Sequence, residues 1–296
     1  MTGPPSHLPG VPFFLPAAVG QRLCVYHAPP PGQKPHAAVL YVPPFGEEMN
    51  KTRRMAALQA RAFARAGVAV LLIDPYGCGD SSGDFADARW DIWKDDLGLA
   101  HAWLAGRAGV PVMLWGLRLG ALLALDYAEQ AWAPVNRFLL WQPVFSGEAH
   151  MTRLLRIRLA NEMLGADADA DPSGDPSGRS TSGLRDAIRR GKSLEVAGYE
   201  IAAALYAAID AVSAVSLAPT GSQVDWFEIV ADASRPVPPA SLAAINNWKD
   251  QGVDLRIHCV PGAPFWSTSD IVECPALVDV TVASAATPAT ATATLP

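Results

Sequence analysis

Apolar runs of strand length recur along the chain, separated by segments whose apolar residues have helical spacing. The apolar runs cover residues 36–44, 68–77, 110–115 and 135–144. The helical segments between them cover residues 50–67, 90–106 and 119–131. Because strands that alternate with helices build repeated β-α-β units, this order predicts a mostly parallel central sheet with helices on both faces. Upstream, two short strands are expected around a turn at Gly20.

The alternation stops after residue 145 and resumes after residue 219. Between these points the sequence predicts further helices and a flexible loop at residues 165–183, which is rich in Gly, Ser and Asp. Two more strands and a helix then follow, at residues 223–231, 253–260 and 239–252 respectively. The predicted domains are an α/β core of residues 1–145 and 220–285, a helical lid inserted at 146–219, and a disordered tail at 286–296.

Composition narrows the classes of protein that this chain can represent. It has 296 residues, of which 50% are hydrophobic, and a formal net charge of −6, which argues against a nucleic-acid surface. No apolar run reaches the ~18 residues of a membrane span, and the N-terminal segment lacks signal-peptide features. We therefore expect a cytoplasmic protein. The cysteines lack C-x-x-C spacing, so we expect reduced thiols and neither a metal nor a cofactor.

The stretch VMLWGLRLGALLAL, residues 112–125, combines an apolar strand, a Gly-x-x-x-Gly turn and a helix of small residues. This is the setting of the nucleophile elbow G-x-S-x-G, in which a strained turn presents a catalytic serine. In this chain the central position is Arg118. The stretch therefore predicts the backbone of an elbow without its nucleophile.

Several further segments, taken in chain order, resemble one known family. They are PPFGEEMNKTRRM, DPYGCGDSSGDF, WGLRLGALLA, EVAGYEI and VPGAPFW. Over about residues 12–280 the chain resembles the α/β-hydrolase superfamily and, within it, the second type of exosortase A system-associated hydrolase. The resemblance implies an α/β-hydrolase fold and a gene beside exosortase and exopolysaccharide genes of Gram-negative bacteria. The hydrolase name of that family rests on its fold, and a fold does not establish an activity.

A serine hydrolase of this fold needs a serine at the elbow, an acid after a later strand and a histidine near the end. Those positions hold Arg118, Ser234 and Pro264, with Asp232 close enough to substitute for the acid. The nearest histidine, His258, falls inside the preceding strand, where a packed or edge residue is expected. The remaining histidines lie early in the chain or in helices, out of register. We therefore expect no Ser-His-Asp triad.

Three roles are open to Arg118. Together with the free N–H groups of the following helix, its guanidinium can bind a carboxylate or phosphate. In the second role an internal carboxylate, Glu47, Glu48 or Asp232, holds it in a salt bridge. In the third it takes a direct part in catalysis, with Asp232 and Glu47 as the other candidate groups.

The loop PPFGEEMNK supplies another part of the predicted pocket. In relatives this loop provides an oxyanion-hole N–H, so Phe45 or Gly46 is the expected donor, paired with the N–H of Leu119. The predicted binding residues are therefore Phe45, Gly46, Arg118 and Leu119.

The same loop leads into the helix expected at residues 50–67. Asn50 is the predicted N-cap of that helix. Glu47 and Glu48 either support the cap or, if buried, act as acid-base groups.

Other reactive, aromatic or charged side chains have a structural interpretation as well. Cys78 and Ser81 are nucleophiles only if a base reaches them. The tryptophans of the helix at 90–106, Trp90, Trp93 and Trp103, are expected in the core. The lid carries basic residues that form a solvated face or, if they face the elbow, steer an anion: Arg153, Arg156, Arg158, Arg189, Arg190 and Lys192.

Two functions from different classes remain. The first is hydrolysis of an ester, thioester or related acyl bond in exopolysaccharide or exported-protein metabolism, which needs a replacement nucleophile or an activated water. The second is a catalytically inactive pocket protein that binds a small anionic or acyl ligand, or a protein partner from the same locus. Replacement of all three triad positions favours the second, whereas the pocket-shaping loops fit both.

Overall fold

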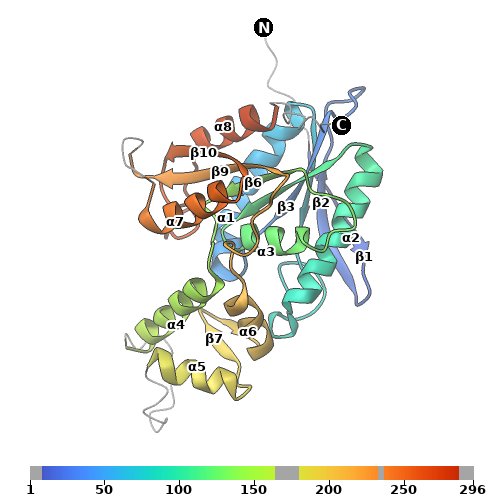
Figure 1. Cartoon of the computed structure of the whole chain (residues 1–296). Helices are drawn as coiled ribbons and strands as arrows, with labels where there is room; N and C mark the ends of the chain where they lie inside the picture. The colour runs from blue at the N-terminus through green and yellow to red at the C-terminus, as the bar shows by residue number, and fades with distance from the viewer. Residues whose placement is uncertain (1–8, 164–179, 233–236, 287–296) are drawn as a thin grey trace.

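The centre of the molecule is an eight-stranded sheet with the strand order β1-β2-β4-β3-β5-β6-β9-β10 (Figure 1). This computed structural model describes residues 9–163, 180–232 and 237–286. The strands are β1 Val11–Pro16, β2 Gln21–His27, β3 Ala37–Val42, β4 Val68–Ile73, β5 Val112–Leu117, β6 Arg137–Trp141, β9 Gln223–Val230 and β10 Asp254–Pro261. The first three strands in this order pair antiparallel, and from β4 to β10 every neighbouring pair is parallel. The mostly parallel sheet is confirmed.

Helices cover both faces of the sheet and bury one apolar cluster on each face. Helices α1 (Gly46–Arg65) and α8 (Pro275–Ala286) cover one face, where Met55, Phe63 and Leu277 are fully buried. Helices α2 (Trp90–Ala108), α3 (Leu119–Ala128) and α7 (Pro239–Asp250) cover the other. A short 3₁₀ helix, Phe85–Asp87, precedes α2. Trp90 and Trp93 are buried in the second cluster as predicted, and Trp103 stacks on Phe13.

The inserted lid extends from the edge of the sheet where the parallel strands end (Figure 1). It consists of α4 (Gly147–Met163), α5 (Thr181–Arg189), a hairpin of β7 (Leu194–Val196) and β8 (Tyr199–Ile201), and α6 (Ala203–Ala211). Helices α4 and α6 approach closely at Gly147, where an added Cβ would lie 1.7 Å from the carbonyl oxygen of Ile209. A side chain at this position would therefore force α4 and α6 apart.

The hairpin corrects the prediction of helices throughout this part of the lid. Ala197 and Gly198 connect β7 to β8 with φ angles of 50° and 81°. Two positive φ angles in a two-residue connection match the right-handed twist of a hairpin, so the chain turns back instead of continuing as a helix.

Two other local predictions were wrong or incomplete. Helix α1 begins at Gly46 with Phe45 as its N-cap, so Asn50 lies inside the helix and donates a hydrogen bond to the Tyr199 hydroxyl at 2.7 Å. Helix α8 was not expected, because its sequence lacks a polar face that would mark it as amphipathic. The predicted tail and most of the predicted loop at 165–183 lie outside the described residues. None of the described helices is long and apolar enough to cross a membrane.

Candidate functional site

The turn between β5 and α3 has the backbone of a nucleophile elbow. Arg118 sits at its tip with φ 56° and ψ −120°, a conformation that is strained for any residue with a Cβ. Its N–H donates to the carbonyl oxygen of Trp141 at 3.0 Å, and its own carbonyl accepts from the N–H of Val144 at 3.1 Å. Neighbouring segments therefore fix the strained turn on both sides.

Two glycines permit this turn for steric reasons. A Cβ at Gly116 would lie 2.4 Å from the Cα of Ala121, and a Cβ at Gly120 would lie 2.2 Å from the carbonyl oxygen of Val42. Both distances are shorter than real Cβ contacts, and both neighbours are backbone atoms that cannot rotate away. The Gly-x-x-x-Gly spacing is therefore a packing requirement of the elbow.

The guanidinium of Arg118 is held inside the protein. Its Nη2 lies 3.3 Å from Oε1 of Glu48, and its Nη1 donates to the carbonyl oxygen of Gln142 at 3.2 Å. The ring of Trp266 packs on the guanidinium, with 5.2 Å between the guanidinium carbon and the ring centroid. Of the three carboxylates considered from the sequence, Glu48 is thus the one that pairs with Arg118. Asp232 lies exposed, two residues beyond the end of β9.

Two residues from the first half of α4 complete a charged group around Glu48. The Nη1 atom of Arg153 lies 3.9 Å from Oε1 of Glu48, so Glu48 connects the elbow with the lid. Burial lowers the pKa of His150 to about 4; Glu48 opposes this shift, whereas Arg118 and Arg153 contribute to it. The imidazole is therefore neutral at pH 7. We call Glu48, Arg118, His150 and Arg153 the elbow cluster.

A cavity of about 410 Å³ lies between the elbow cluster and the lid. This volume is in the range of sites for small molecules. Its walls are Phe45, Gly46, Glu47, Glu48, Lys51, His150, Arg153, Leu154, Ile157, Val196, Ala197, Tyr199, Ile201, Trp266 and Ser267. The ring of His150 faces this space and forms no hydrogen bond within the described part of the chain. Arg118 lies behind Glu48 and is not part of the wall.

The predicted backbone donors lie next to this cavity. The N–H groups of Phe45, Gly46 and Leu119 donate no hydrogen bond within the described residues, as expected at the first turns of α1 and α3. Phe45 and Gly46 line the large cavity, whereas Leu119 and Phe45 line a second one of about 10 Å³, which has room for about one water molecule. The space in front of the elbow is thus nearly filled, and the open volume lies towards the lid.

The reactive side chains of DPYGCGDSSGDF are not activated. Burial, with a further contribution from Asp74, raises the pKa of the Cys78 thiol to about 12, so the thiol is protonated at neutral pH. The hydroxyl of Ser81 donates to the carbonyl oxygen of Asp74 at 2.5 Å and accepts from the N–H of Leu23 at 2.8 Å. Both side chains therefore stabilise the loop.

The segment where a catalytic histidine was sought contributes an aromatic side chain instead. Pro264 lies in the loop after β10, and the next residues, Phe265 and Trp266, are buried. Trp266 both packs on Arg118 and lines the cavity. Ser234 lies outside the described residues. No described position supplies a Ser-His-acid arrangement at the elbow, and no cluster of metal-ligating side chains occurs in the described ranges.

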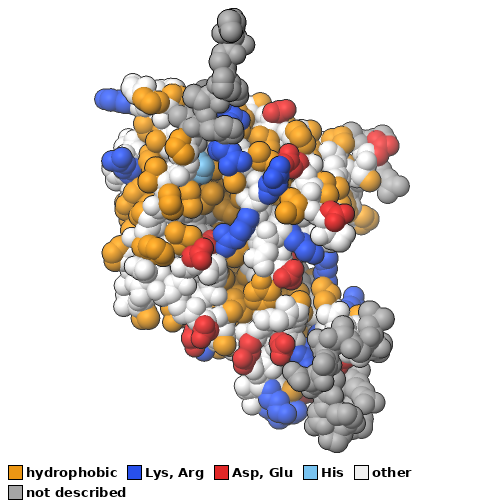
Figure 2. Space-filling model, turned by 180° about the vertical axis from the view of Figure 1, so that it is seen from behind, with side chains coloured by type: hydrophobic (Ala, Val, Ile, Leu, Met, Phe, Trp, Pro, Cys, Tyr) orange, Lys and Arg blue, Asp and Glu red, His pale blue; other side chains and the backbone are white. Residues whose placement is uncertain are grey.

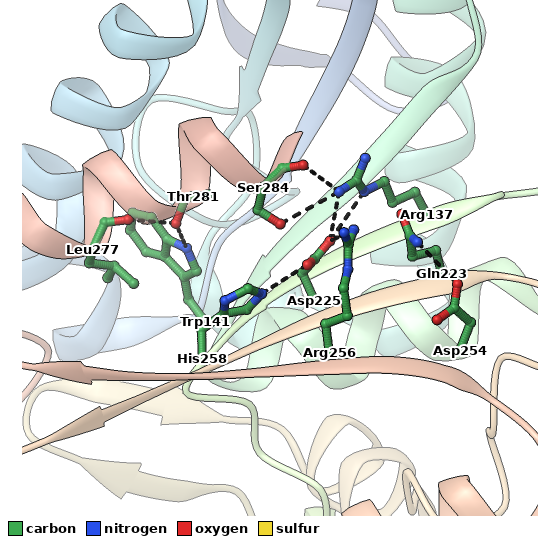
Figure 3. A network of polar contacts seen from close by, with 10 residues as sticks. All are labelled: Arg137, Trp141, Gln223, Asp225, Asp254, Arg256, His258, Leu277, Thr281 and Ser284. Carbon is green, nitrogen blue, oxygen red and sulfur yellow. Dashed lines mark hydrogen bonds and ion pairs between the residues drawn. The ribbon is translucent and has the colours of Figure 1, made fainter. Parts of the chain in front are cut away.

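His258 belongs to a polar network around Asp225 that joins β6, β9, β10 and α8 (Figure 3). Its Nε2 lies 2.9 Å from Oδ1 of Asp225, and its ring stacks on Phe227, as expected for a packed edge-strand residue. Oδ2 of Asp225 accepts from Arg137 at 2.9 Å and from Arg256 at 3.0 Å. We call Arg137, Asp225, Arg256, His258 and Ser284 the Asp225 cluster.

The Asp225 cluster anchors α8 to the beginning of three parallel strands. Arg137 is the first residue of β6, and its Nη2 also donates to the carbonyl oxygen of Ser284 at 2.6 Å (Figure 3). Burial alone would raise the pKa of Asp225, but hydrogen bonds from His258, Ser284 and Arg137 lower it to about 2. The carboxylate is therefore ionised and saturated with donors, which is the pattern of a structural ion cluster.

The basic residues of the lid do not form one continuous face. Arg158 pairs with Glu162 and Arg189 pairs with Asp186, whereas Arg153 alone of the predicted set lines the cavity. On the face seen in Figure 2, Lys and Arg side chains are interleaved with Asp and Glu side chains, both on the core and on the lid below it. Any steering of an anion therefore depends on the cavity and less on the outer surface.

His150 is the residue of the site that sequence reasoning set aside. It was excluded because a histidine in the lid is out of register with a catalytic triad. A different signal was present, since His150, Arg153, Leu154 and Ile157 have the spacing of one helix face and all line the cavity. Tyr199 and Trp266 also line it and had no recognisable motif.

Comparison with known proteins shows which fold this chain shares. Residues 33–168, slightly less than half of the chain, match the family model of serine aminopeptidase, S33. Est1E from Butyrivibrio proteoclasticus with ferulic acid bound is similar at 15% identity and a TM-score of 0.64, over 92% of this chain and 97% of that one. A soluble variant of monoglyceride lipase from Saccharomyces cerevisiae in complex with a substrate analog is similar at 13% identity and a TM-score of 0.60, over 96% and 97%. No curated protein sequence matches the chain.

The strand order and these matches show that the chain has the α/β-hydrolase fold. Residues 33–168 are similar to the serine aminopeptidases, and more than nine-tenths of the chain shares its fold with Est1E and with the monoglyceride lipase variant. The predicted α/β-hydrolase fold is thus confirmed. Structural likeness at this level of sequence identity shows a shared fold and does not show a shared activity.

Proposed function

We propose that this protein binds a small anionic or acyl ligand in the lid cavity and does not perform Ser-His-acid hydrolysis. The observation that carries the proposal is the pairing of Arg118 with Glu48 at the elbow, where a nucleophile would have to stand free, beside an open cavity. In this proposal Phe45 and Gly46 contact the ligand. Arg118 holds Glu48 in place, and Leu119 contributes the N-terminus of α3.

The charges around the cavity support an anionic ligand. Lys51 and Arg153 line the wall together with Glu47 and Glu48, and Arg118 lies directly behind Glu48. Glu48 is already neutralised by its two arginine partners. A partly enclosed space with excess positive charge attracts anions more strongly than the same charges in water.

The resemblance over residues 12–280 supports a proposal about where the protein acts and in which metabolism. We place the protein in the cytoplasm, acting beside an exosortase and exopolysaccharide locus. Its ligand is then a carboxylate or acylated intermediate of exopolysaccharide or exported-protein metabolism. A protein encoded in the same locus is the proposed partner if the ligand must be passed on.

Hydrolysis of an acyl bond by an activated water is the second candidate, and His150 favours it. A neutral imidazole facing the cavity can take a proton from a water that attacks an acyl carbonyl. The carbonyl oxygen would accept from the free N–H groups of Phe45 and Gly46. Cleavage of the ester or thioester then yields a carboxylic acid and an alcohol or thiol.

Labelling with a serine-directed fluorophosphonate separates triad chemistry from the proposal. We expect no labelling of the purified chain, and none of the Arg118→Ser variant, because Pro264 stands in the loop after β10 where the activating histidine of a triad is expected. Stoichiometric labelling of the unmodified chain would overturn the proposal. Thioester hydrolysis that is present in the unmodified chain and lost in His150→Gln would establish the second candidate instead.

A further inference from the structure

We propose that the ligand of the lid cavity is an amphipathic carboxylate, an aliphatic chain whose carboxylate points towards the elbow and is bound by Arg153 and His150. This inference rests on the proposed function and narrows its ligand class. It assigns the anion to a lid arginine rather than to Arg118.

The cavity has a polar end and an apolar end because of the direction of α4. His150, Arg153, Leu154 and Ile157 line the same cavity at spacings of three, four and seven residues. At ~1.5 Å per residue, Ile157 lies about 10 Å further along the helix axis than His150. Helix α4 starts beside the core and leads into the lid, so the polar end faces the elbow (Figure 1).

Arg153 is the cation that α4 contributes to this end, and it can accept a second anion. Its side chain is 50% exposed, and its contact with Glu48 is long, at 3.9 Å. Arg118, by comparison, is 11% exposed and lies closer to Glu48, at 3.3 Å, with a further bond to Gln142. Glu48 therefore stays paired when Arg153 turns to a ligand, and a guanidinium can bind a carboxylate with two parallel hydrogen bonds.

His150 supplies a second donor at the same end. The residue is 8% exposed, and its ring has no hydrogen bond within the described part of the chain. Because His150 lines the cavity, a ligand oxygen there can accept a hydrogen bond from a ring nitrogen that has no partner among the described residues. The neutral ring, whose pKa burial lowers to about 4, carries one N–H that can donate to a carboxylate oxygen.

The opposite end of the cavity suits an aliphatic chain. Its walls include Leu154 and Ile157 from α4, and Val196 and Ile201 from the hairpin. The charged residues of the wall are Arg153 and three residues of α1, so the rest of the lid contributes no charged group to it. A headgroup alone would leave this apolar surface uncovered, whereas an alkyl chain would bury it.

Calorimetric titration of the full chain with carboxylates of increasing length tests the inference. From butanoate to octanoate we expect the affinity to rise roughly three- to fourfold per added methylene, because burial of each group is favourable. Octanol, which lacks the charge, should bind at least tenfold more weakly than octanoate. An affinity for acetate equal to that for octanoate would overturn the inference.

Substitutions on α4 test the assignment of the headgroup. Arg153→Gln should lower the affinity for octanoate about tenfold. Arg156→Gln removes the same charge from an exposed position of the same helix outside the cavity, and should change the affinity less than twofold. Equal effects of the two substitutions would overturn the role of Arg153 while leaving anion binding intact. Absence of binding for every carboxylate, by folded protein, would remove the proposed function as well.

Discussion

The elbow cluster, at the turn between β5 and α3, and the Asp225 cluster, between the sheet and α8, hold their charges in different ways. Asp225 is completely buried and accepts from three side chains at 2.9–3.0 Å. Glu48 is 19% exposed, and its arginine partners lie at 3.3 and 3.9 Å. Both clusters contain a histidine. The ring of His258 is bonded to the carboxylate, whereas the ring of His150 faces a cavity.

This difference separates a structural ion cluster from a candidate binding site. In the Asp225 cluster the donors and acceptors are matched within the protein, and the result is to fasten α8 to the sheet. In the elbow cluster donors remain that no described residue uses, and they line an open volume. Polar groups inside a protein normally have hydrogen-bond partners. Donors beside a cavity that lack a protein partner therefore indicate a ligand.

Removal of the Asp225 carboxylate should cause the largest loss of stability. Asp225→Asn leaves the guanidinium of Arg137 buried without its counter-charge, and we expect a loss of about 3–5 kcal/mol in the free energy of unfolding. Urea denaturation at pH 7 measures this loss. Asp254→Asn, an exposed neighbour on β10, is the matched control and should cost less than about 0.5 kcal/mol. A loss below about 1 kcal/mol for Asp225→Asn would mean that the cluster is not structural.

Acid should destabilise the two clusters in separate pH windows. The pKa of His150 is about 4 in the folded protein and 6.5 without the fold, so the unfolded chain takes up a proton first as pH falls below 6.5. At pH 5 this linkage lowers the free energy of unfolding by about 2 kcal/mol relative to pH 7. The His150→Gln variant should lack that loss when both proteins are unfolded with urea at each pH. His27, which has the same shift, contributes equally to both proteins.

The Asp225 contribution changes in the same direction, with stability lost as pH falls, but in a lower pH window. The folded pKa of Asp225, about 2, lies below its ordinary value of 3.8, so its stabilisation is present above pH 4 and disappears as pH falls towards 2. Identical slopes for the unmodified chain and His150→Gln between pH 7 and 5 would show that His150 is solvated rather than buried at the site.

Loss of the carboxylate at the elbow should have the smallest effect. Glu48→Gln removes a long, partly exposed ion pair, and Arg118 keeps its bond to Gln142, so we expect a loss of about 1 kcal/mol. Thermal unfolding of the Glu48→Gln and Asp225→Asn variants under the same conditions measures the ratio of their two losses in stability. A loss as large as that of Asp225→Asn would make the elbow cluster a structural ion pair too, and would remove the distinction drawn above.

The core was predictable from the sequence because its signals are periodic. Continuous apolar runs such as residues 68–73 become buried parallel strands, and Gly116 and Gly120 mark the elbow by their spacing. Helix α8 and the lid hairpin were missed. The first has no polar stripe, and the second depends on two positive φ angles in an Ala-Gly pair, where Asn-Gly is the usual signal.

The candidate site was predictable only where it follows the backbone of the α/β-hydrolase fold. The elbow and the loop at Phe45 could be placed by register, and Glu48 was among the partners considered for Arg118. His150 and Trp266 could not be found in this way, because their proximity results from how the lid and the loop after β10 pack against α1. Contacts between distant segments leave no local pattern in a single sequence.

The dihedral angles at residue 118 are set by other residues. The two flanking glycines and the bonds to Trp141 and Val144 hold the turn, so every side chain with a Cβ meets a similar strain there. The backbone at this position is therefore expected to keep its conformation when the side chain is replaced. A replacement of Arg118 would release Glu48 from its closer arginine partner with little change in the turn, which makes residue 118 a starting point for redesigning the charge next to the cavity.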